Sequence, residues 1–530
     1  MDVTDQQSNA ILPSALAALA ASAAYPHPVN ALQIIETHIS WVILTGSYAY
    51  KIKRPVHYPF VDFRSLERRE FFCREELRLN RRFAPDVYLA VVRIVRSAGK
   101  LQVGGEGEPV EFAVQMRQFD PALELGALVE RGTATLAELQ AFGVNLGKVH
   151  ATVPVHPHND GRRRTARMLL ANAGQCRRAT RDADIRRRLD RITLPLQQRL
   201  GQTGETIDAR ARAGFVRECH GDLHMSNVAR IDGRLQAFDC LEFEPEFRHI
   251  DVAQELAFLC MDLQVHGRAD LASGFLNAWL AATGDYAAVE LLDLFEAHCA
   301  LVRAKVCALN LDRPAVRDRE SLCDRQARCV AHAEWRLAES VPRLLLFHGL
   351  SGSGKSWLAE RLAIVLPAIH LRSDIERKRL AGLAAQDSSD SAPGLGLYAE
   401  ERTQRTYDHL LELAAAILRG GRIAMVDATF LSRGTRARFV QLAAGFGIKP
   451  QLIDCQAPDD VLRERIAARA RSGRDPSEAD LDVLGWQRQH LQAVTPDEGL
   501  ESIPIDTAAE DSVAQASRVL LPATAAARQG

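Results

Sequence analysis

The sequence lacks several features that identify other classes of protein. The formal net charge of the 530 residues is −1, so the overall charge favours neither nucleic acid nor an anionic membrane as a partner. The ten cysteines occur singly, without a CxxC pair or a ligand-like Cys/His cluster. This pattern argues against a structural zinc site and fits a reducing compartment. No uncharged run reaches the roughly 18 residues that a membrane-spanning helix needs.

The amino-terminal stretch ILPSALAALAASAA is apolar, but it lacks the basic residues that begin a signal peptide. Asp2 and Asp5 stand in their place. We therefore expect an alanine-rich helix at this end of the chain and a cytoplasmic protein.

Lysine is also scarce, with 8 lysines against 58 arginines. Arginine is thus the default cation of this chain, and the position of each lysine is informative. Lys51, Lys53 and Lys355 all lie where a bound phosphate would need a positive charge.

At roughly 100–200 residues per domain, a chain of this length should form more than one domain. The clearest boundary lies near residue 340, where Pro342 separates a long charged helical stretch from the apolar run RLLLFH. We predict one domain over residues 1–338 and a second over residues 339–530.

The expected elements differ on the two sides of this boundary. Before it, two strands joined by a Gly-Ser turn over residues 41–54 precede a charged helix over 65–84 and strands near 87–97 and 109–119. A mostly helical segment follows to residue 337. After the boundary, strands and helices alternate from residue 343 to residue 471, which indicates a parallel sheet with crossover helices.

The segment HGDLHMSN, residues 220–227, contains residues suited to phosphoryl transfer. That reaction needs bound phosphates, correctly placed metal ions and an oriented acceptor hydroxyl. Asp222 would accept the proton of the acceptor hydroxyl, and Asn227 would hold a magnesium ion. Asp239, in QAFDCLEF, would bridge a second magnesium ion and the phosphates of ATP.

Two lysines upstream could bind those phosphates. Lys51 and Lys53 lie two residues apart on a predicted strand, so both point to the same face and the sequence does not choose between them. A glutamate on the following helix should pair with the lysine; Glu76 in CREELRLN is our choice, and Glu75 is the alternative.

Residues 41–310 resemble the aminoglycoside phosphotransferase-like branch of the kinase-like fold, through HGDLHMSN, FDCLEF, YKIKRP and EELRLNRRFAPDVY. The resemblance implies a two-lobed kinase fold with ATP between the lobes. The chain departs from kinases in having no GxGxxG loop and in carrying Cys240 where DFG has phenylalanine. Glu242, Glu244 and Glu246 could bind an amine-rich substrate, but we favour a solvated acidic loop.

The segment GLSGSGKS, residues 349–356, matches the P-loop pattern GxxxxGK[ST] between an apolar strand and a helix. Its glycines let backbone N–H groups surround phosphate oxygens, and the helix amino terminus adds positive potential. Lys355 would reach the β- and γ-phosphates and Ser356 would bind magnesium, which Asp427 in IAMVDATF would hold through water. The predicted nucleotide-binding residues are Gly349, Ser351, Gly352, Ser353, Gly354, Lys355 and Ser356.

Two further segments predict residues around the transferred phosphate. Asp374, at the end of IHLRSD, could orient or deprotonate an acceptor hydroxyl, and Arg377 one turn later could hold the acceptor. In RERIAARARSGRDPSEAD, Arg465, Arg469 and Arg474 could form a lid over the phosphates. This half resembles small P-loop kinases such as gluconate kinase, chloramphenicol phosphotransferase and the zeta-toxin type. The resemblance implies a doubly wound parallel sheet and a lid, but not the acceptor.

Eleven arginines lie within residues 161–191. A nucleic-acid surface is one interpretation, but the segment contains no aromatic residues on which single-stranded bases could stack. Asp182, Asp184 and Asp190 dilute its charge. We therefore expect a solvated helix face, with attraction of an anionic substrate as the intermediate alternative.

Together the motifs predict an α+β kinase-like domain fused to an α/β P-loop domain. Their order resembles bacterial proteins described as bifunctional aminoglycoside phosphotransferase/ATP-binding proteins. The predicted function is that of an ATP- and Mg²⁺-dependent phosphotransferase acting on hydroxyls of small molecules. One alternative is a nucleotide-binding regulatory protein in which one domain gates the other, and another is a kinase acting on a nucleic-acid end or a protein. The acceptors, the number of active domains, their coupling and the oligomeric state are not determined by the sequence.

Overall fold

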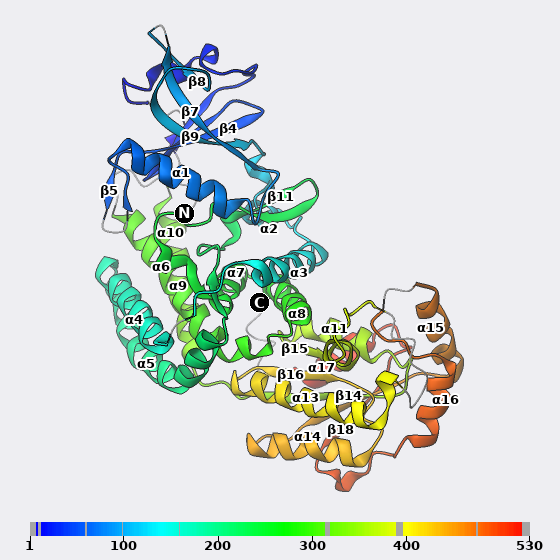
Figure 1. Ribbon diagram of the computed structural model, residues 1–530. Coiled ribbons are helices and arrows are strands. Elements are labelled where there is room, and N and C mark those ends of the chain that lie inside the picture. The colour runs from blue at the N-terminus through cyan, green and yellow to red at the C-terminus, as the bar shows by residue number, and fades with distance from the viewer. Residues whose placement is uncertain are drawn as a thin grey trace. The chain divides into compact units, whose positions relative to one another are not determined.

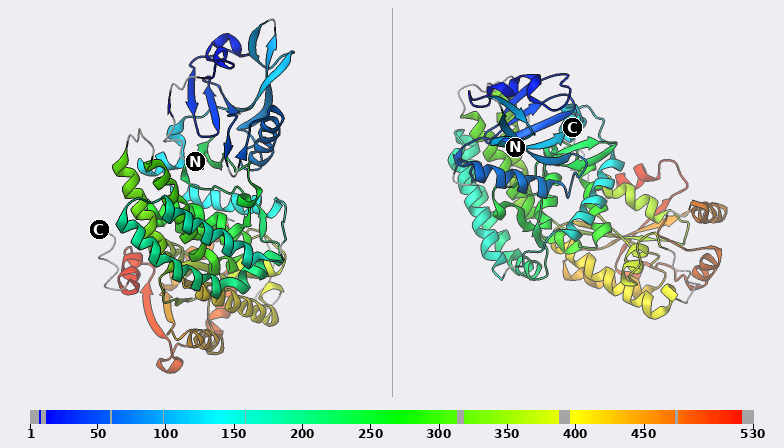
Figure 2. Two further views of the ribbon diagram at one scale, coloured as in Figure 1. Left: turned by 90° about the vertical axis from the view of Figure 1, so that its left-hand side faces the viewer. Right: turned by 45° about the horizontal axis from the view of Figure 1, so that its top comes forward.

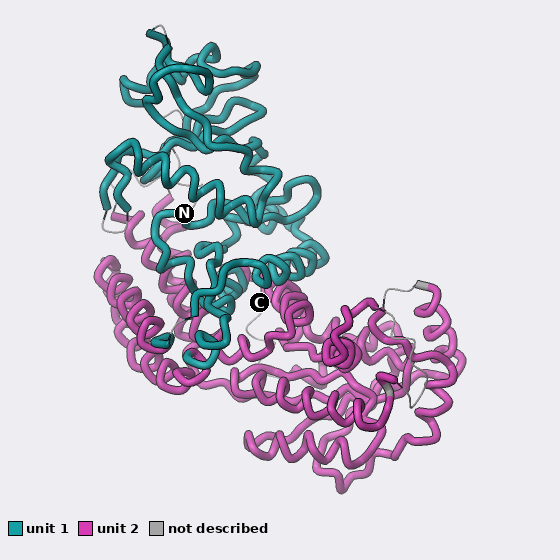
Figure 3. Tube along the Cα trace, in the orientation of Figure 1, with its two compact units in different colours: residues 1–161, 208–262 teal, residues 162–207, 263–530 magenta. Residues whose placement is uncertain are grey.

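The computed structural model describes residues 7–8, 12–58, 61–97, 99–157, 159–312, 318–387, 396–472 and 475–521 (Figure 1). The chain forms two compact units, and each is built from two stretches of sequence. Residues 1–161 and 208–262 make unit 1, and residues 162–207 and 263–530 make unit 2 (Figure 3). Helices before residue 338 therefore share a unit with the sheet after it, so the predicted division at 338/339 does not coincide with the division into units. The domain boundary at residues 338/339 stays a prediction.

Unit 1 begins with a seven-stranded antiparallel sheet of order β1-β2-β3-β4-β9-β7-β8. The helix α1, Leu66–Asn80, packs against it and starts at Ser65, whose side chain accepts a hydrogen bond from the Arg68 N–H. The strands are β1 Gln7–Ser8, β2 Gln33–Glu36, β3 Ser40–Leu44, β4 Tyr48–Lys53, β7 Tyr88–Ser97, β8 Lys100–Val103 and β9 Glu108–Arg117, with a separate hairpin of β5 His57–Tyr58 and β6 Val61–Asp62. The strands β3, β4, β7 and β9 and the helix α1 were expected from the sequence, whereas β1, β2, β5, β6 and β8 were not.

The amino-terminal segment differs from the prediction. The alanine-rich stretch forms two short 3₁₀ turns, η2 Ala17–Ala20 and η3 Ser22–Ala24, instead of a helix. Leu12, Leu16 and Leu19 of this segment are buried in one cluster with side chains of the sheet. A short isolated helix is marginal in water, so the packing of these leucines decides the local conformation.

The remainder of unit 1 carries the HGDLHMSN segment between two small antiparallel sheets. One sheet pairs β10 Val216–Glu218 with β13 His249–Asp251, and the other pairs β11 Val228–Ile231 with β12 Arg234–Ala237. The helical elements here are η4 Pro121–Leu123, α2 Leu125–Glu130, α3 Leu136–Thr152, η5 Met225–Asn227, α6 Pro245–Arg248 and α7 Val252–Val265. Unit 1 thus has an antiparallel sheet with one helix, followed by a mostly helical part in which the catalytic loop lies between short strands. This arrangement is the predicted kinase-like fold.

Unit 2 contains a group of long helices. They are α4 Gly161–Ala179, α5 Ala183–Arg212, α8 Ala269–Thr283, η6 Tyr286–Ala288, α9 Val289–Leu311 and α10 Arg319–Leu337. Residue 161 and residues 208–212, at the ends of α4 and α5, belong to unit 1. The arginine-rich helices α4 and α5 run side by side (Figures 1 and 2), and Arg177 on α4 pairs with Asp190 on α5. Arg181 pairs with Asp312, and Arg188 with Glu334, so acidic partners offset part of the charge. Among the described residues, no helix combines the length and apolar character that a membrane crossing requires.

The other part of unit 2 is a five-stranded parallel sheet of order β15-β16-β14-β17-β18. Its strands are β14 Arg343–His348, β15 Ile369–Arg372, β16 Ile423–Asp427, β17 Gln451–Gln456 and β18 Glu501–Asp506. The helices are α11 Lys355–Val365, α12 Ser373–Leu380, η7 Gly396–Tyr398, α13 Glu400–Arg419, α14 Arg433–Gly445, α15 Asp459–Ser472, α16 Leu481–His490, η8 Pro496–Glu498 and α17 Ser512–Leu520. This topology confirms the predicted doubly wound sheet.

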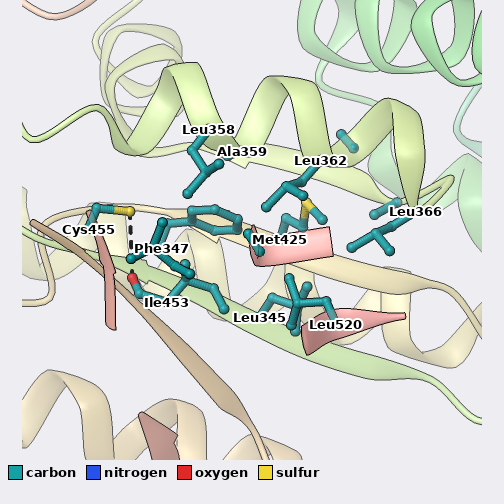
Figure 4. Packing of buried hydrophobic residues seen from close by; sticks show 14 of the residues in the cluster. Leu345, Phe347, Leu358, Ala359, Leu362, Leu366, Met425, Ile453, Cys455 and Leu520 are labelled. Carbon is teal, nitrogen blue, oxygen red and sulfur yellow. Dashed lines mark hydrogen bonds between the residues drawn. The ribbon is translucent and has the colours of Figure 1, made fainter. Parts of the chain in front are cut away.

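The core of this sheet explains the position of the P-loop. Leu345 and Phe347 of the central strand pack against Leu358 and Leu362 of α11, together with Met425 of β16 (Figure 4). All five side chains are fully buried. Because apolar contacts fix α11 on the sheet, the loop between β14 and α11 presents its backbone at the carboxyl ends of the strands, where ligands bind in such sheets.

Candidate functional sites

The first candidate site lies on the loop between β10 and β11. The Asn227 side-chain amide donates to Asp222 Oδ2 at 3.2 Å and to the Asp222 carbonyl at 2.9 Å. His224 Nε2 lies 3.4 Å from the same carboxylate, whose side chain is 19% exposed. The fold thus brings the predicted base and the predicted metal ligand together, and the side chain of the base is partly exposed.

The oxygen of the Asn227 amide suits a metal ion. Asn227 Oδ1 is buried and has no hydrogen-bond partner within the described residues, although such a group normally has one. Asp239 follows β12 with a φ of 63°, a strained value for a residue other than glycine. Its backbone N–H donates to the Tyr88 hydroxyl at 3.0 Å, which helps to hold that conformation. Amide and carboxylate oxygens are the ligands that Mg²⁺ prefers.

The structure separates the two lysines that the sequence could not. Lys51 Nζ lies 2.8 Å from Glu76 Oε1 and also pairs with Asp239. Lys53 pairs with the other oxygen of Glu76 and with Glu242. The Lys51 side chain is 12% exposed, whereas that of Lys53 is fully buried. Lys51 is therefore the lysine beside the carboxylate of the predicted metal site, and Lys53 stabilises the charges behind it.

The position of Glu242 corrects the expectation of a solvated acidic loop. Glu242 is buried against Lys53, Glu244 accepts the Glu246 N–H at the start of α6, and Glu246 is exposed. The reason is that Lys53, at the end of β4, needs a second counter-charge once it is buried. Local sequence around Glu242 contains no sign of that distant lysine.

Electrostatic interactions keep this cluster charged. Burial alone would lower the pKa of Lys51, but the Asp239 and Glu76 carboxylates raise it well above its usual value. Burial alone would raise the pKa of Asp239, but the Lys51 ammonium lowers it to about 2. Both groups therefore stay ionised at neutral pH, which suits a phosphate-binding lysine and a metal-binding carboxylate.

Two acidic residues on α7 support the catalytic loop, and the sequence analysis did not select them. Glu255 Oε2 accepts the backbone N–H groups of His220 at 2.6 Å and Gly221 at 3.2 Å, and its other oxygen lies 3.0 Å from His150 Nε2. Asp262 accepts the Met225 N–H at 2.9 Å. Their spacing of seven residues places both on one face of a helix, which is the signal that could have identified them.

The second candidate site is the P-loop of unit 2. The Lys355 ammonium donates to the Gly349 and Leu350 carbonyls, each at 2.8 Å. Gly349 has a φ of 139°, and a Cβ there would lie 2.5 Å from the Cys455 carbonyl oxygen, so only glycine fits. The Ser351 N–H donates to Gln487 Oε1 at 2.8 Å, which brings α16 onto the loop. Gln487 stands more than a hundred residues from the motif, and sequence analysis missed it.

Asp427 ends β16 beside this loop and is 4% exposed. His370 Nε2 lies 3.3 Å from its Oδ2, and Arg372 Nε lies 4.0 Å away. Burial would raise the pKa of Asp427, but the hydrogen bond with His370 and the nearby cations lower it to about 2. The group is thus a carboxylate at any working pH, as a metal ligand must be.

A cavity of about 1260 Å³ opens over the P-loop. Its lining includes Ser356 and Asp427 together with the predicted acceptor residues Asp374 and Arg377, whose side chains lie 3.4 Å apart. Arg469 also lines it and donates to the Ala479 carbonyl. Most of the predicted residues of this half therefore meet at one cavity.

Arg465, another predicted lid arginine, lines the same cavity. It donates to the Gly352 carbonyl and to Thr507, so it contacts the P-loop directly. Arg474 lies outside the described residues.

Known proteins resemble parts of this chain. A family model described as an AAA domain matches residues 344–494. Among solved structures, a sugar kinase from Janibacter is 21% identical, covers 35% of this chain and 97% of its own, and has a TM-score of 0.28. A choline/ethanolamine kinase family protein from Mesorhizobium loti is 16% identical, covers 59% of this chain and 92% of its own, and has a TM-score of 0.38. The fold assignments rest on the strand orders and registers described above.

Two mycobacterial proteins match most of the chain. They are the uncharacterized proteins Rv2004c of Mycobacterium tuberculosis and Mb2027c of Mycobacterium bovis, each 30% identical over 461 residues, which is 85% of this chain and 89% of the relative. The chain therefore belongs to the same family as these mycobacterial proteins, and it joins a kinase-like fold to a P-loop domain.

Proposed function

We propose that the protein is an ATP-dependent phosphotransferase with two nucleotide sites, each transferring a phosphoryl group to a hydroxyl of a small molecule. The observation that carries this proposal is the meeting, at each site, of a phosphate-binding lysine with carboxylates from distant parts of the chain. In unit 1, Lys51 pairs with Asp239 and with Glu76. His220 connects this pair to the base, because its ring contacts the Asp222 N–H and the carbonyl of Phe238, the residue before Asp239. In unit 2, Lys355, Asp374 and Asp427 line one cavity.

At the first site, Asp222 is the proposed general base. Its carboxylate accepts the proton of the acceptor hydroxyl, and the hydroxyl oxygen then bonds to the γ-phosphorus. The bond from that phosphorus to the β,γ-bridging oxygen breaks, and ADP leaves with the electron pair. Lys51 neutralises phosphate charge, while Glu255 holds the loop that carries Asp222.

At the second site, Asp374 has the corresponding role, and Arg377 beside it holds the acceptor. The backbone N–H groups of the P-loop and Lys355 bind the β- and γ-phosphates. The cavity exceeds the about 300–1,000 Å³ of ordinary ligand pockets. Its volume of about 1260 Å³ supports the binding of a nucleotide together with a second molecule.

Both sites have residues that fit magnesium. Asn227 and Asp239 would hold it in the first site, and Ser356 and Asp427 in the second. The buried, unpartnered Asn227 Oδ1 and the permanently ionised Asp427 support this assignment. When bound, magnesium neutralises phosphate charge that develops during transfer.

The test is Mg²⁺-dependent ATP turnover against a panel of sugars, aminoglycosides and nucleosides. Wild type is compared with Asp222→Asn, Lys355→Met and the double variant. We expect at least one acceptor whose stimulation is lost in one single variant only, by about 10²–10⁴-fold for Asp222→Asn. Turnover that survives in the double variant, or ATP binding to neither site, would contradict the proposal.

A further inference from the structure

We propose that Asn277 on α8 is a positioning residue of the P-loop site, because it holds the edge strand β15 from which His370 orients Asp427. The inference rests on the proposed nucleotide and magnesium site at the P-loop. It adds two residues that lie outside every motif of that site.

The first step is the contact between α8 and the edge of the sheet. β15 is the outermost strand and pairs with β16 on one side (Figure 1). On the other side, Asn277 Nδ2 donates to the Ala368 carbonyl at 2.9 Å, and Asn277 Oδ1 accepts the His370 N–H at 2.8 Å. The amide therefore supplies the donor and the acceptor that a further strand would supply to an unpaired edge.

The chemistry of this contact is specific for asparagine. One side chain must donate to a carbonyl and accept from an N–H two residues further along the strand. Only an amide carries both groups in a fixed plane, and only one of its two orientations satisfies both partners. A hydrophobic side chain at this position would leave the Ala368 carbonyl, which lies on a buried residue, without its partner.

The second step leads from β15 to Asp427. His370 and Arg372 are two apart on the strand, so their side chains leave it on the same face. Arg372 is the residue paired in register with Asp427. His370 Nε2 lies 3.3 Å from Asp427 Oδ2. The backbone that Asn277 binds and the imidazole that contacts Asp427 thus belong to the same residue.

The third step is the consequence for magnesium. A metal-binding carboxylate is oriented by the groups that hydrogen-bond to it, and loss of such a group typically weakens metal affinity by about 10–100-fold. Asp427 is 4% exposed and lies on β16, so the contact with His370 is one of few that orient its carboxylate. A shift of β15 would carry His370 away from that carboxylate.

The helix α8 ends well before residue 338. The P-loop site would thus depend on a side chain that precedes the predicted second domain over residues 339–530. The helices of unit 2 and the P-loop sheet would form one functional body.

The test compares Asn277→Ala with Ser273→Ala in the full-length protein. Ser273 lies one turn earlier on α8 and donates to the Ala363 carbonyl of α11 at 2.7 Å. Its Oγ also accepts from Asn277 Nδ2 at 3.3 Å, but the alanine change leaves both contacts of Asn277 with β15 in place, so it is a control at the same interface. The measurement is the Mg²⁺ dependence of fluorescent ATP-analogue binding, from which the signal of the same variant carrying Lys355→Met is subtracted. Hydrogen exchange of the β15 peptide is recorded in parallel.

We expect Asn277→Ala to raise the Mg²⁺ concentration for half-maximal binding by about tenfold and to speed exchange in β15. Ser273→Ala should leave both unchanged. His370→Ala should raise the Mg²⁺ requirement similarly without faster exchange, and His370→Gln, which keeps a donor, should recover part of the affinity.

Equal shifts in Asn277→Ala and Ser273→Ala would overturn the proposal, because they would indicate a general loss of packing. Faster exchange with an unchanged Mg²⁺ requirement would also overturn it. ATP binding without any turnover would contradict only the proposed phosphotransferase function, since the binding comparison does not depend on catalysis.

Discussion

The two sites are built in opposite ways. The charged groups of the first site come from residues 51 to 242 and meet as buried and partly buried ion pairs of side chains. The phosphate-binding part of the second is eight consecutive residues, and Lys355 there contacts backbone carbonyls. A site built from long-range pairs depends on the whole fold for its charge balance, whereas a loop of glycines carries its geometry locally.

This difference predicts different costs for removing a lysine. Lys53→Met would leave Glu76 and Glu242 buried together without their shared cation, so we expect a loss of about 3–5 kcal/mol in the stability of unit 1. Lys355→Met removes hydrogen bonds to two backbone carbonyls and leaves Asp427 with His370 and Arg372, so it should cost less, about 1–3 kcal/mol. Chemical denaturation, followed by hydrogen exchange in peptides of each unit, measures both. Equal losses of stability in Lys53→Met and Lys355→Met would contradict the contrast between a site held by long-range ion pairs and a site held by local backbone geometry.

Glu255→Gln tests how far the first site depends on support from α7. The variant keeps the shape of the side chain but replaces the carboxylate that accepts the His220 and Gly221 N–H groups with a neutral amide. Because hydrogen bonds to a charged group are worth about 1.5–3 kcal/mol, we expect the loop to lose up to this much stabilisation in the transition state. The value of kcat at the first site should fall, exchange of residues 220–227 should rise, and turnover at the P-loop should not change. An unchanged kcat would mean that the loop keeps its conformation without this carboxylate.

Gly349→Ala is the matching change in the second site. The new Cβ would meet the Cys455 carbonyl at 2.5 Å and would occupy a φ of 139°, so the loop must move at a cost of about 1–3 kcal/mol. We expect weaker ATP binding at the P-loop by the corresponding factor, while the first site is unaffected. Isothermal titration with the first site saturated or disabled provides the measurement, and unchanged affinity would contradict the local-geometry argument.

Gln487→Ala should have the smallest effect. It removes one neutral hydrogen bond to the Ser351 N–H, which is worth about 0.5–1.5 kcal/mol. We expect up to a tenfold change in KM for ATP at the P-loop and none at the first site. Gln487→Glu, which keeps the acceptor but places a negative charge beside the phosphates, should weaken binding more than the alanine variant. The reverse order would contradict a direct role at the phosphates.

Much of the second half was predictable because its signals are local. The strand before GLSGSGKS and the helix after it follow from neighbouring residues. The strands β14, β15, β16 and β17 lie within the alternation of strands and helices that was predicted over residues 343–471. The strand β18 and the helices after residue 471 were not assigned, because their apolar patterns are short. Gln487 and His370 could not be selected, since their partners lie elsewhere in the chain.

In the first half, local patterns predicted the strands β3, β4, β7 and β9, the helix α1 and the catalytic loop, but not the short strands β1, β2, β5, β6 and β8. They did not distinguish Lys51 from Lys53, because residues two apart on a strand point to the same face of the sheet. They also favoured a solvated Glu242, because nothing near it in sequence indicates the buried lysine. The prediction of an alanine-rich helix at the amino terminus was wrong for a related reason, because the leucines of this segment pack against the sheet.

The sequence by itself determined the two phosphate-binding motifs, the alternation of strands and helices and the residue types available for catalysis. These depend on spacing along the chain, which backbone geometry turns directly into a strand, a helix or a nest of N–H groups. Only the tertiary structure decided which lysine faces Asp239, that Glu255 holds the catalytic loop and that α8 reaches β15. Those choices come from the burial of charges and polar groups, whose free energy depends on partners far away in the sequence.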